Sequence, residues 1–374
     1  MPKLWIRLIL SPVLIPISWV YGFVVFVRNK LFDLKILRSV KFDIPVISVG
    51  NITVGGTGKT PHVEYLLGLL SSDQKTAMLS RGYKRKTHGF LMANSNTQPR
   101  DIGDEPFQVL SKFSNITVAV DSHRVNGIEQ LKKIIRDLQV VVLDDAFQHR
   151  YVKPRISIAL VDYCRPVFKD YLLPFGYLRE RMSALRRADI IIVSKVPENA
   201  YTDETLVWKK NLKLHAQQPL YFTTYEYSEL IPVFNSNIQK MKLNDMENKA
   251  CAVVLVTGIA NPKPLAEKIR SLGIEIIQLQ YSDHREYTQK DLSDIEKKFL
   301  SIENTNKIIV TTEKDAVKLR QFKDLTSTIK EKIYYMPIHV KFLYGKKEEF
   351  DGRIVETVNS DQLTVISDQK KALS

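Results

Sequence analysis

Residues 46–67, VISVGNITVGGTGKTPHVEYLL, contain the clearest structural signal in the sequence. A β-branched apolar run leads into a glycine-rich loop, as expected for a buried parallel strand that ends at a binding edge. After the loop, apolar residues recur at helical spacing: Val63, Leu66, Leu67 and Leu70. A helix that follows such a loop directs free N–H groups and its positive dipole end at an anion. The order strand, loop, helix therefore predicts a phosphate-binding unit.

The loop departs from the strict pattern G-x-x-x-x-G-K-[ST], because Thr53 stands where the first glycine belongs. Three glycines remain to give the backbone freedom that a phosphate cradle requires. We expect Lys59 to reach the β- and γ-phosphates of a nucleotide and the Thr60 hydroxyl to join Mg²⁺. The alternative is an ordinary strand-to-helix turn with a solvated lysine. The predicted nucleotide-binding residues are Thr53, Gly55, Gly56, Thr57, Gly58, Lys59 and Thr60.

A second motif, VVVL at 140–143 followed by Asp144 and Asp145, supplies the acids that such a loop needs. A carboxylate at the carboxyl end of a neighbouring strand lies beside the metal ion of the nucleotide. One acid would bind Mg²⁺ directly and the other a metal-bound water, in an order that the sequence does not indicate. Taken alone, the pair also fits a capped turn, but its occurrence together with Lys59 favours the metal site.

Composition sets the class of protein. With 374 residues, 44% hydrophobic and 26% charged, the chain is an ordinary globular protein long enough for two domains. Cys164 and Cys251 are far apart, so neither a disulfide framework nor a zinc site is indicated and a reducing compartment fits. The net charge of +14 favours an anionic partner: nucleic acid, a membrane surface or a phosphorylated substrate.

The N-terminus narrows that choice. Residues 8–27 carry no charge, and their number suffices for a helix that crosses a bilayer. Pro12 and Pro16 oppose one regular spanning helix, and basic residues flank both ends of the segment. We predict a kinked helix that lies in the cytoplasmic face of a membrane. A true span and a buried soluble helix are the two alternatives, and either membrane arrangement weighs against nucleic acid as the partner.

Strand-like and helix-like runs alternate through the first two hundred residues, which is typical of an α/β fold. We predict a P-loop NTPase-like, doubly wound parallel sheet, a second, smaller α/β domain and an N-terminal membrane-associated helix. Strands are expected near 45–50, 76–80, 116–120, 139–143, 156–161 and 189–194. The expected divisions are a membrane-associated segment (1–30), a P-loop domain (31–216), an extended ribbon (217–250), a smaller α/β domain (251–345) and a C-terminal tail (346–374).

Two further acidic stretches are ambiguous by themselves. Asp104 and Glu105 precede Pro106, as helix-start residues commonly do. His284 lies in a loop between a predicted strand and a helix whose start, Thr288, has capping-box spacing to Asp291. Such a histidine faces the cleft side of an α/β sheet, where acid–base groups lie, although a surface histidine is the commoner outcome.

Taken in order, the motifs resemble those of a known family. They are GNITVGGTGKTP, SRGYKRKTHG, DIGDEP, DSHR, VVLDDAFQHR, LLPFGYLRE, TGIANP, YSDH with REYTQKDL, and TTEKDAVKL. This series is similar to that of the tetraacyldisaccharide 4′-kinases of lipid A synthesis and extends from the N-terminal segment to about residue 340. The family itself lacks a strict first glycine in its phosphate loop. This chain departs from many relatives at Ala146 and Arg285, neither of which is a predicted ligand.

The resemblance implies an activity: transfer of the γ-phosphate of ATP, with Mg²⁺, to the 4′-hydroxyl of a tetraacyldisaccharide 1-phosphate. It also implies a peripheral or monotopic enzyme at the cytoplasmic face of the bacterial inner membrane. The implied partners are the lipid A precursor disaccharide and the membrane surface, with no nucleic acid. Acyl-chain preference and oligomeric state are not indicated.

The resemblance also assigns roles to residues. Asp104 would accept the proton of the attacking sugar hydroxyl. His284, from the second domain, would orient and tune Asp104, with domain closure assembling the pair around bound substrates. Thr60, Asp144 and Asp145 would place Mg²⁺. Arg81, Arg124 and the basic turn at 179–187 are candidates for binding the anionic disaccharide, although each fits a solvated surface charge as well.

Two other classes of function compete with a lipid kinase. One is a phosphate-loop ATPase that binds nucleic acid or a partner protein, and the apolar N-terminus weighs against it. The other is a membrane-anchored, GTPase-like metallochaperone. The sequence lacks both Cys/His metal clusters and an Asn/Thr-Lys-x-Asp base-reading motif, which disfavours that second class.

Overall fold

The computed structural model describes residues 9–200, 204–234, 238–248, 251–283, 285–322 and 325–372. The chain forms two compact units. The first comprises Met1–Thr97, Lys112–Tyr225 and Val340–Ser374, and the second comprises Gln98–Ser111 and Glu226–His339. Each unit therefore combines segments that are distant in the sequence.

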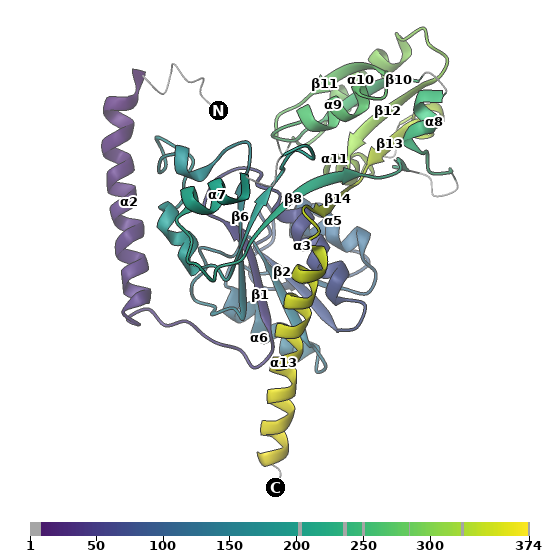
Figure 1. Cartoon of the computed structure of the whole chain (residues 1–374). Helices are drawn as coiled ribbons and strands as arrows, with labels where there is room; N and C mark the ends of the chain where they lie inside the picture. Colours follow the sequence, from purple (N-terminus) through teal and green to yellow (C-terminus); the bar gives the residue numbers. More distant parts are fainter. Residues whose placement is uncertain are drawn as a thin grey trace. The chain divides into compact units, whose positions relative to one another are not determined.

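The first unit is built on a mainly parallel sheet (Figure 1). Its nine strands, within the described residues, follow the order β14-β8-β7-β6-β1-β5-β2-β4-β3. Because β1 pairs with β5 on one side and β6 on the other, the chain winds outward in both directions, which confirms the doubly wound prediction. The strands are β1 (Val46–Asn51), β2 (Thr76–Ser80), β3 (Leu91–Met92), β4 (Thr117–Val120), β5 (Val140–Asp144), β6 (Ile156–Asp162), β7 (Ile190–Ser194), β8 (Leu220–Tyr227) and β14 (Ile338–Phe342). All six expected strands are present, as β1, β2, β4, β5, β6 and β7.

Every residue of β1, β5 and β6 is buried, so both faces of this sheet need cover. Apolar residues of α6 pack beside those of β2 and β5, and Trp208 and Leu212 of α7 pack beside residues of β6 and β7. Besides α2 (Ser11–Asp33), the longer helices of this unit are α3 (Lys59–Leu70), α6 (Arg124–Ile134), α7 (Glu204–Leu212) and α13 (Lys347–Ala372). Within the expected tail, residues 347–372 form α13, which buries Phe350, Ile354 and Val358 at four-residue spacing.

Helix α2 (Ser11–Asp33) is the long purple helix of Figure 1. Pro12 lies in its first turn, where a missing N–H costs little, and Pro16 lies inside it. By length and composition α2 is able to cross a membrane, and only 11% of its apolar window is buried. The helical prediction is confirmed, whereas the alternative of a buried soluble helix does not fit this exposure.

The second unit has its own sheet, in the order β11-β10-β12-β13-β9. The pairs among β10 to β13 are parallel and β9 is antiparallel, which confirms a second, smaller α/β body. The segment at 217–250 supplies β8 to the first sheet and β9 with α8 to the second unit. The second unit's elements are β9 (Ile231–Pro232), β10 (Ala252–Thr257), β11 (Glu275–Gln280), β12 (Lys307–Thr312), β13 (Ile333–Met336), α4 (Pro99–Ile102), α5 (Asp104–Lys112), α8 (Leu243–Asn248), α9 (Lys263–Arg270), α10 (Gln289–Leu300), α11 (Glu313–Leu319) and α12 (Ser327–Lys330).

Candidate functional site

The glycine-rich loop joins the end of β1 to the start of α3. Gly55 and Gly58 have positive φ angles, 95° and 85°, which residues with a β-carbon rarely adopt. A β-carbon at Gly58 would also lie 2.0 Å from the hydroxyl oxygen of Tyr225. Gly58 is therefore required both by its conformation and by the close approach of a neighbouring side chain.

Thr53 occupies the position where the strict pattern has glycine, and its conformation explains why a side chain is tolerated there. Its φ angle is not positive, and it pairs with Leu178 in an antiparallel bridge. The next N–H, of Val54, donates to the carbonyl of Tyr177 at 2.8 Å. Position 53 thus has extended, paired backbone, so glycine is not needed.

Buried hydrogen bonds fix the loop from below. The Asn51 amide donates to Thr57 Oγ1 at 2.7 Å, and the Ser194 hydroxyl donates to the Thr57 carbonyl at 2.7 Å. His62 Nδ1 lies 2.8 Å from the Gly58 carbonyl, and its Nε2 lies 3.0 Å from Thr223 Oγ1. Burial lowers the pKa of His62 to about 4, so this histidine is neutral near pH 7. Arg165 donates to the Val54 carbonyl at 2.9 Å and Lys195 to the Gly56 carbonyl, so neutral and cationic partners together preorganise the loop.

The two acids lie at the same edge of the sheet as the loop. Asp144 ends β5, and Val49 of β1 is its partner in the parallel register. The carboxylate of Asp144 is 2% exposed and accepts a hydrogen bond from Ser80 Oγ at 3.1 Å. Asp145 follows in the left-handed region, at a φ of 45°. This turn directs consecutive carboxylates to different positions at the strand end.

Lys59 and Asp145 meet at this edge. Lys59 Nζ is 3.5 Å from Asp145 Oδ1, and Arg179 Nη1 is 3.2 Å from both carboxylate oxygens. Burial alone raises the pKa of Asp145, but the Lys59 ammonium and the Arg179 guanidinium outweigh it, so the pKa lies below its ordinary value. The phosphate loop and the acid turn thus form one cation-rich site that holds an ionised carboxylate.

The donors at this edge suit a hard metal ion. Asp144, Asp145 and Thr60 offer only oxygen atoms, the ligands that Mg²⁺ prefers. Across the part of the chain that the structure describes, no group of three or more His, Cys, Asp or Glu side chains forms a metal cage. Mg²⁺ is usually held by one or two carboxylates together with substrate phosphates and water, and this donor set fits that arrangement.

The predicted substrate-binding arginines differ in environment. Arg81 is exposed. Arg124 is 2% exposed and donates to the carbonyls of Asp121 and Asp144, at 2.7 and 3.1 Å. Burial lowers the pKa of Arg124 to about 10. Arg124 therefore supports the strand end beside Asp144, and the alternative of a solvated surface charge does not hold for it.

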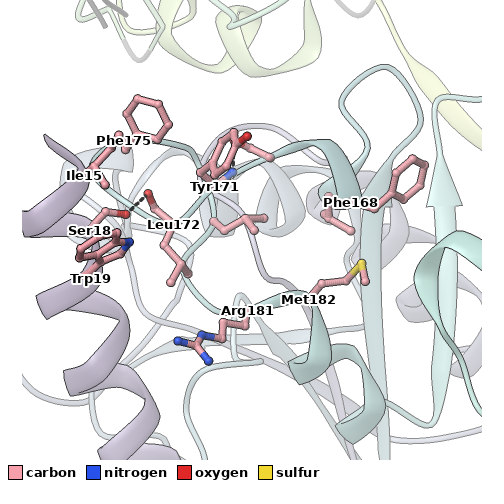
Figure 2. Close-up of a pocket in the computed structure, with 12 residues that line it drawn as sticks. Ile15, Ser18, Trp19, Phe168, Tyr171, Leu172, Phe175, Arg181 and Met182 are labelled. Atoms are coloured by element: carbon pink, nitrogen blue, oxygen red, sulfur yellow. Dashed lines mark hydrogen bonds between the residues drawn. The ribbon is translucent and has the colours of Figure 1, made fainter. Parts of the chain in front are cut away.

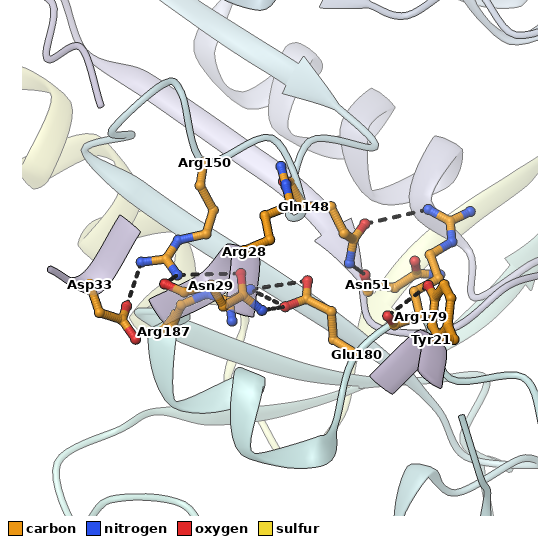
Figure 3. A network of polar contacts seen from close by, with 10 residues as sticks. All are labelled: Tyr21, Arg28, Asn29, Asp33, Asn51, Gln148, Arg150, Arg179, Glu180 and Arg187. Atoms are coloured by element: carbon orange, nitrogen blue, oxygen red, sulfur yellow. Dashed lines mark hydrogen bonds and ion pairs between the residues drawn. The ribbon is translucent and has the colours of Figure 1, made fainter. Parts of the chain in front are cut away.

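The structure connects α2 to this site, which sequence reasoning missed (Figure 3). Tyr21 donates its hydroxyl hydrogen to the Arg179 carbonyl at 2.9 Å, and the Asn29 amide donates to Glu180 Oε2 at 2.7 Å. Arg187 also donates to Glu180, at 2.9 Å. Residues 179 and 180 thus link the inner face of α2 to the carboxylate of Asp145. More than 140 residues separate the two sides of each α2 contact, so no local sequence signal marked them.

A mainly apolar cavity of about 420 Å³ lies between α2 and the segment 167–182 of the same unit. In Figure 2, Ile15, Trp19 and Phe175 line one part of it, and Ser18 donates to the Leu172 carbonyl at 2.7 Å. Arg181 is the one cation among its lining residues. Asp170 also lines it, so the cavity combines an apolar wall with one cationic and one anionic side chain.

Asp104 belongs to the second unit, where it begins α5 as its sequence suggested. Its carboxylate pairs with Lys318 Nζ at 3.0 Å. His284 lies outside the described residues. The adjacent helix start is confirmed: Thr288 and Asp291 form the predicted capping box of α10. The catalytic roles of Asp104 and His284 stay predictions.

Comparison with known proteins gives consistent matches along the chain. A family model described as tetraacyldisaccharide-1-P 4′-kinase matches residues 10–359. A tetraacyldisaccharide 4′-kinase of Phocaeicola vulgatus is 47% identical over 350 residues, which are 93% of this chain and 95% of the relative. One of Bacteroides thetaiotaomicron is 43% identical over 356 residues, 93% of each. The crystal structure of the "apo" form of LpxK from Aquifex aeolicus in complex with ATP has a TM-score of 0.71 and 27% identity, covering 94% of this chain and 99% of that one.

Proposed function

The chain belongs to the tetraacyldisaccharide-1-P 4′-kinase family, and we propose the role of its individual residues in phosphoryl transfer. It is an ATP-dependent kinase of lipid A biosynthesis that acts on the 4′-position of a tetraacyldisaccharide 1-phosphate. The proposals concern its individual residues, its metal ion and its place at the membrane.

The nucleotide site is the loop Gly55–Thr60. The contact of Lys59 with Asp145, at 3.5 Å, carries this proposal, since a nucleotide kinase needs its phosphate-binding cation beside its metal-binding acid. Thr60, Asp144 and Asp145 would hold Mg²⁺, which when bound neutralises charge on the phosphates of ATP. Lys59 and Arg179 lie where their charges would stabilise the transferred phosphoryl group.

Asp104 is the proposed general base. It would take the proton from the 4′-hydroxyl while that oxygen forms its bond to the γ-phosphorus. The bond from the γ-phosphorus to the bridging oxygen breaks, and ADP leaves with that electron pair. The proton stays on the Asp104 carboxyl, and such help contributes roughly 10²–10⁴-fold. The role of His284 as its orienting partner is also a proposal.

The membrane is the proposed source of the lipid substrate. Ten large apolar residues between Ile9 and Val27 are at least 37% exposed, and such a surface is unfavourable in water. This supports membrane association of α2, and we place it in the cytoplasmic face of the inner membrane. The apolar cavity of Figure 2 suits an acyl chain of the substrate, with Arg181 near an anionic group. In this proposal the partners are the lipid substrate and the membrane surface, with no nucleic acid.

Substitutions at the site test this assignment. Lys59→Ala and Asp145→Ala should each lower kcat at least about 100-fold with lipid substrate in micelles, because each removes a charge that positions the transferred phosphate. Lys75→Ala and Asp137→Ala are matched controls, since these residues form an exposed ion pair at 2.8 Å. Turnover by Lys59→Ala equal to that of Lys75→Ala would remove this loop from the mechanism.

A further inference from the structure

We infer that Lys318 is a positioning residue for phosphoryl transfer, which fixes the Asp104 carboxylate and links it to the backbone of Arg285. The inference rests on the proposed role of Asp104 as the base. It concerns the second unit alone, because Asp104, Lys318 and Arg285 all belong to it.

The contacts of Lys318 are made by a nearly buried charge. Its side chain is 7% exposed, whereas that of Asp104 is 24% exposed. Its Nζ lies 3.0 Å from Asp104 Oδ2 and donates to the Arg285 carbonyl at 3.0 Å. An ammonium that is shielded from water requires such partners, so the position of Lys318 Nζ is restricted. The Asp104 carboxylate that it contacts is restricted with it.

The direction of Lys318 is set by the start of its helix. Thr312 caps α11 by accepting from the Asp315 N–H at 3.2 Å, and its hydroxyl donates to Asp315 Oδ2 at 2.7 Å. The Gly258 N–H donates to the same oxygen at 2.9 Å, and Asp315 is fully buried. Helix α11 is thus locked onto the end of β10 one turn before Lys318, which gives the ammonium a fixed position.

A second lysine of α11 provides a natural comparison. Lys314 precedes Lys318 by four residues, so both lie on one face of the helix. Lys314 Nζ is 3.3 Å from Asp283 Oδ1. The two lysines therefore contact the residues on either side of position 284, but the described contact with Asp104 comes from Lys318.

The neighbouring charges have described partners or lie in sequence beside Asp104. Arg285 donates to Asp291 at 2.9 Å, and Asp283 pairs with Lys314. Glu105 follows Asp104 in the first turn of α5. Within the described contacts, Lys318 is the cation that faces the Asp104 carboxylate.

This arrangement has a chemical consequence. A general base must be unprotonated and oriented toward the hydroxyl group from which it takes the proton. An adjacent ammonium favours both conditions. The same cation makes the carboxylate a weaker base, which phosphoryl transfer tolerates because it depends mainly on positioning and charge neutralisation. Loss of Lys318 should therefore reduce kcat and move the acid limb of the kcat–pH profile to higher pH, with little change in the KM for ATP.

The experiment measures kcat and KM between pH 5 and 9 with the full chain in detergent micelles. For Lys318→Met we expect kcat about 10-fold to 100-fold lower, an acid limb displaced upward by about one pH unit, and a KM for ATP within about 2-fold of wild type. Lys318→Arg should restore the limb, and Lys314→Met should leave it in place. In an Asp104→Ala background, Lys318→Met should have no further effect, because Lys318 acts through Asp104.

Each contrary result has a separate meaning. If Asp104→Ala loses activity but Lys318→Met keeps wild-type kcat and acid limb, the positioning role is overturned and the base remains. If Asp104→Ala keeps its kcat, the proposed base itself is overturned. Thermal unfolding in the same detergent checks folding, and Lys318→Gln replaces a Met variant that does not fold. Failure of both to fold would show that Lys318 serves only the structure.

Discussion

Gly58 is constrained both by its backbone conformation in the phosphate loop and by the side chain that packs against it. Its φ of 85° excludes most side chains, and Tyr225 occupies the space that a β-carbon would need. The neighbouring departure at Thr53 is harmless because that backbone is extended and paired with Leu178. A motif position is therefore replaceable where conformation permits, and fixed where conformation and contact both forbid it.

Gly58→Ala should weaken ATP binding strongly. The strained φ costs about 1–2 kcal/mol, and the overlap with Tyr225 must displace the loop as well. We expect the Kd for ATP, measured by calorimetry, to rise at least about 10-fold. Gly68→Ala is the control, since this α3 glycine has no positive φ and its nearest contact is at 3.8 Å. Equal affinities of the two variants would show that the loop tolerates a side chain at position 58.

His62 should make stability depend on pH. Its pKa is about 4 in the folded protein, below the unfolded value of 6.5, because burial disfavours the charged ring. As the pH falls below 6.5, His62 is protonated in the unfolded state but stays neutral in the folded state. The free energy of unfolding therefore decreases until the pH reaches about 4. The full loss is about 3 kcal/mol. The Tm of wild type in detergent should therefore fall more steeply from pH 7 to 4.5 than that of His62→Gln. Parallel slopes would assign the acid sensitivity to other groups.

At the scale of elements, α2 divides its surface between two environments. Ser18, Tyr21 and Asn29 make hydrogen bonds to the segment 172–180 of the same unit, while Trp19, Val20 and Phe23 are exposed. Hydrogen bonds from one side of α2 thus fix the helix to the protein, and its remaining apolar surface is available to lipid.

Two lysine substitutions test that surface. Val20→Lys and Phe23→Lys replace side chains that are each 65% exposed. Burying one such apolar side chain in lipid is worth about 1.5–3 kcal/mol, so each variant should bind anionic vesicles at least about 10-fold more weakly in co-sedimentation. Leu206→Lys is the control, because Leu206 is 72% exposed on α7. A similar loss in the control would mean that general charge, rather than α2, determines vesicle binding.

Elements with local signals were predictable from the sequence. The capping box of Thr288 and Asp291 needs only three residues of separation, and the β1–loop–α3 unit is one continuous stretch. Contacts made by folding were not predictable in this way. Arg179 lies 34 residues beyond Asp145, and nothing near it in the sequence indicates a carboxylate partner. The sequence therefore offers it only as a candidate for substrate binding or as a solvated charge.

At the scale of the whole molecule, the alternation of strands and helices was sufficient for the fold class but not for the division of the chain. Residues 98–111, which carry Asp104, group with the C-terminal unit, although they lie between strands of the first sheet in sequence. Hydropathy periodicity describes which face of an element is buried and contains no information on the unit against which it packs. For the same reason the pairing of Asp104 with Lys318 required the structure.

Two properties of the whole chain, its net charge of +14 and its apolar helix α2, indicate the same kind of partner. An anionic, membrane-embedded substrate satisfies both features, since the charge attracts its phosphate and the helix places the protein at its surface.

The most direct measurement follows the label from γ-labelled ATP, with Mg²⁺ and tetraacyldisaccharide 1-phosphate in detergent micelles. Wild type should transfer the label to the 4′-position of the lipid, and Lys59→Ala should transfer almost none. Label found only as free phosphate, or equal lipid labelling by Lys59→Ala, would contradict a phosphate loop that serves a lipid acceptor.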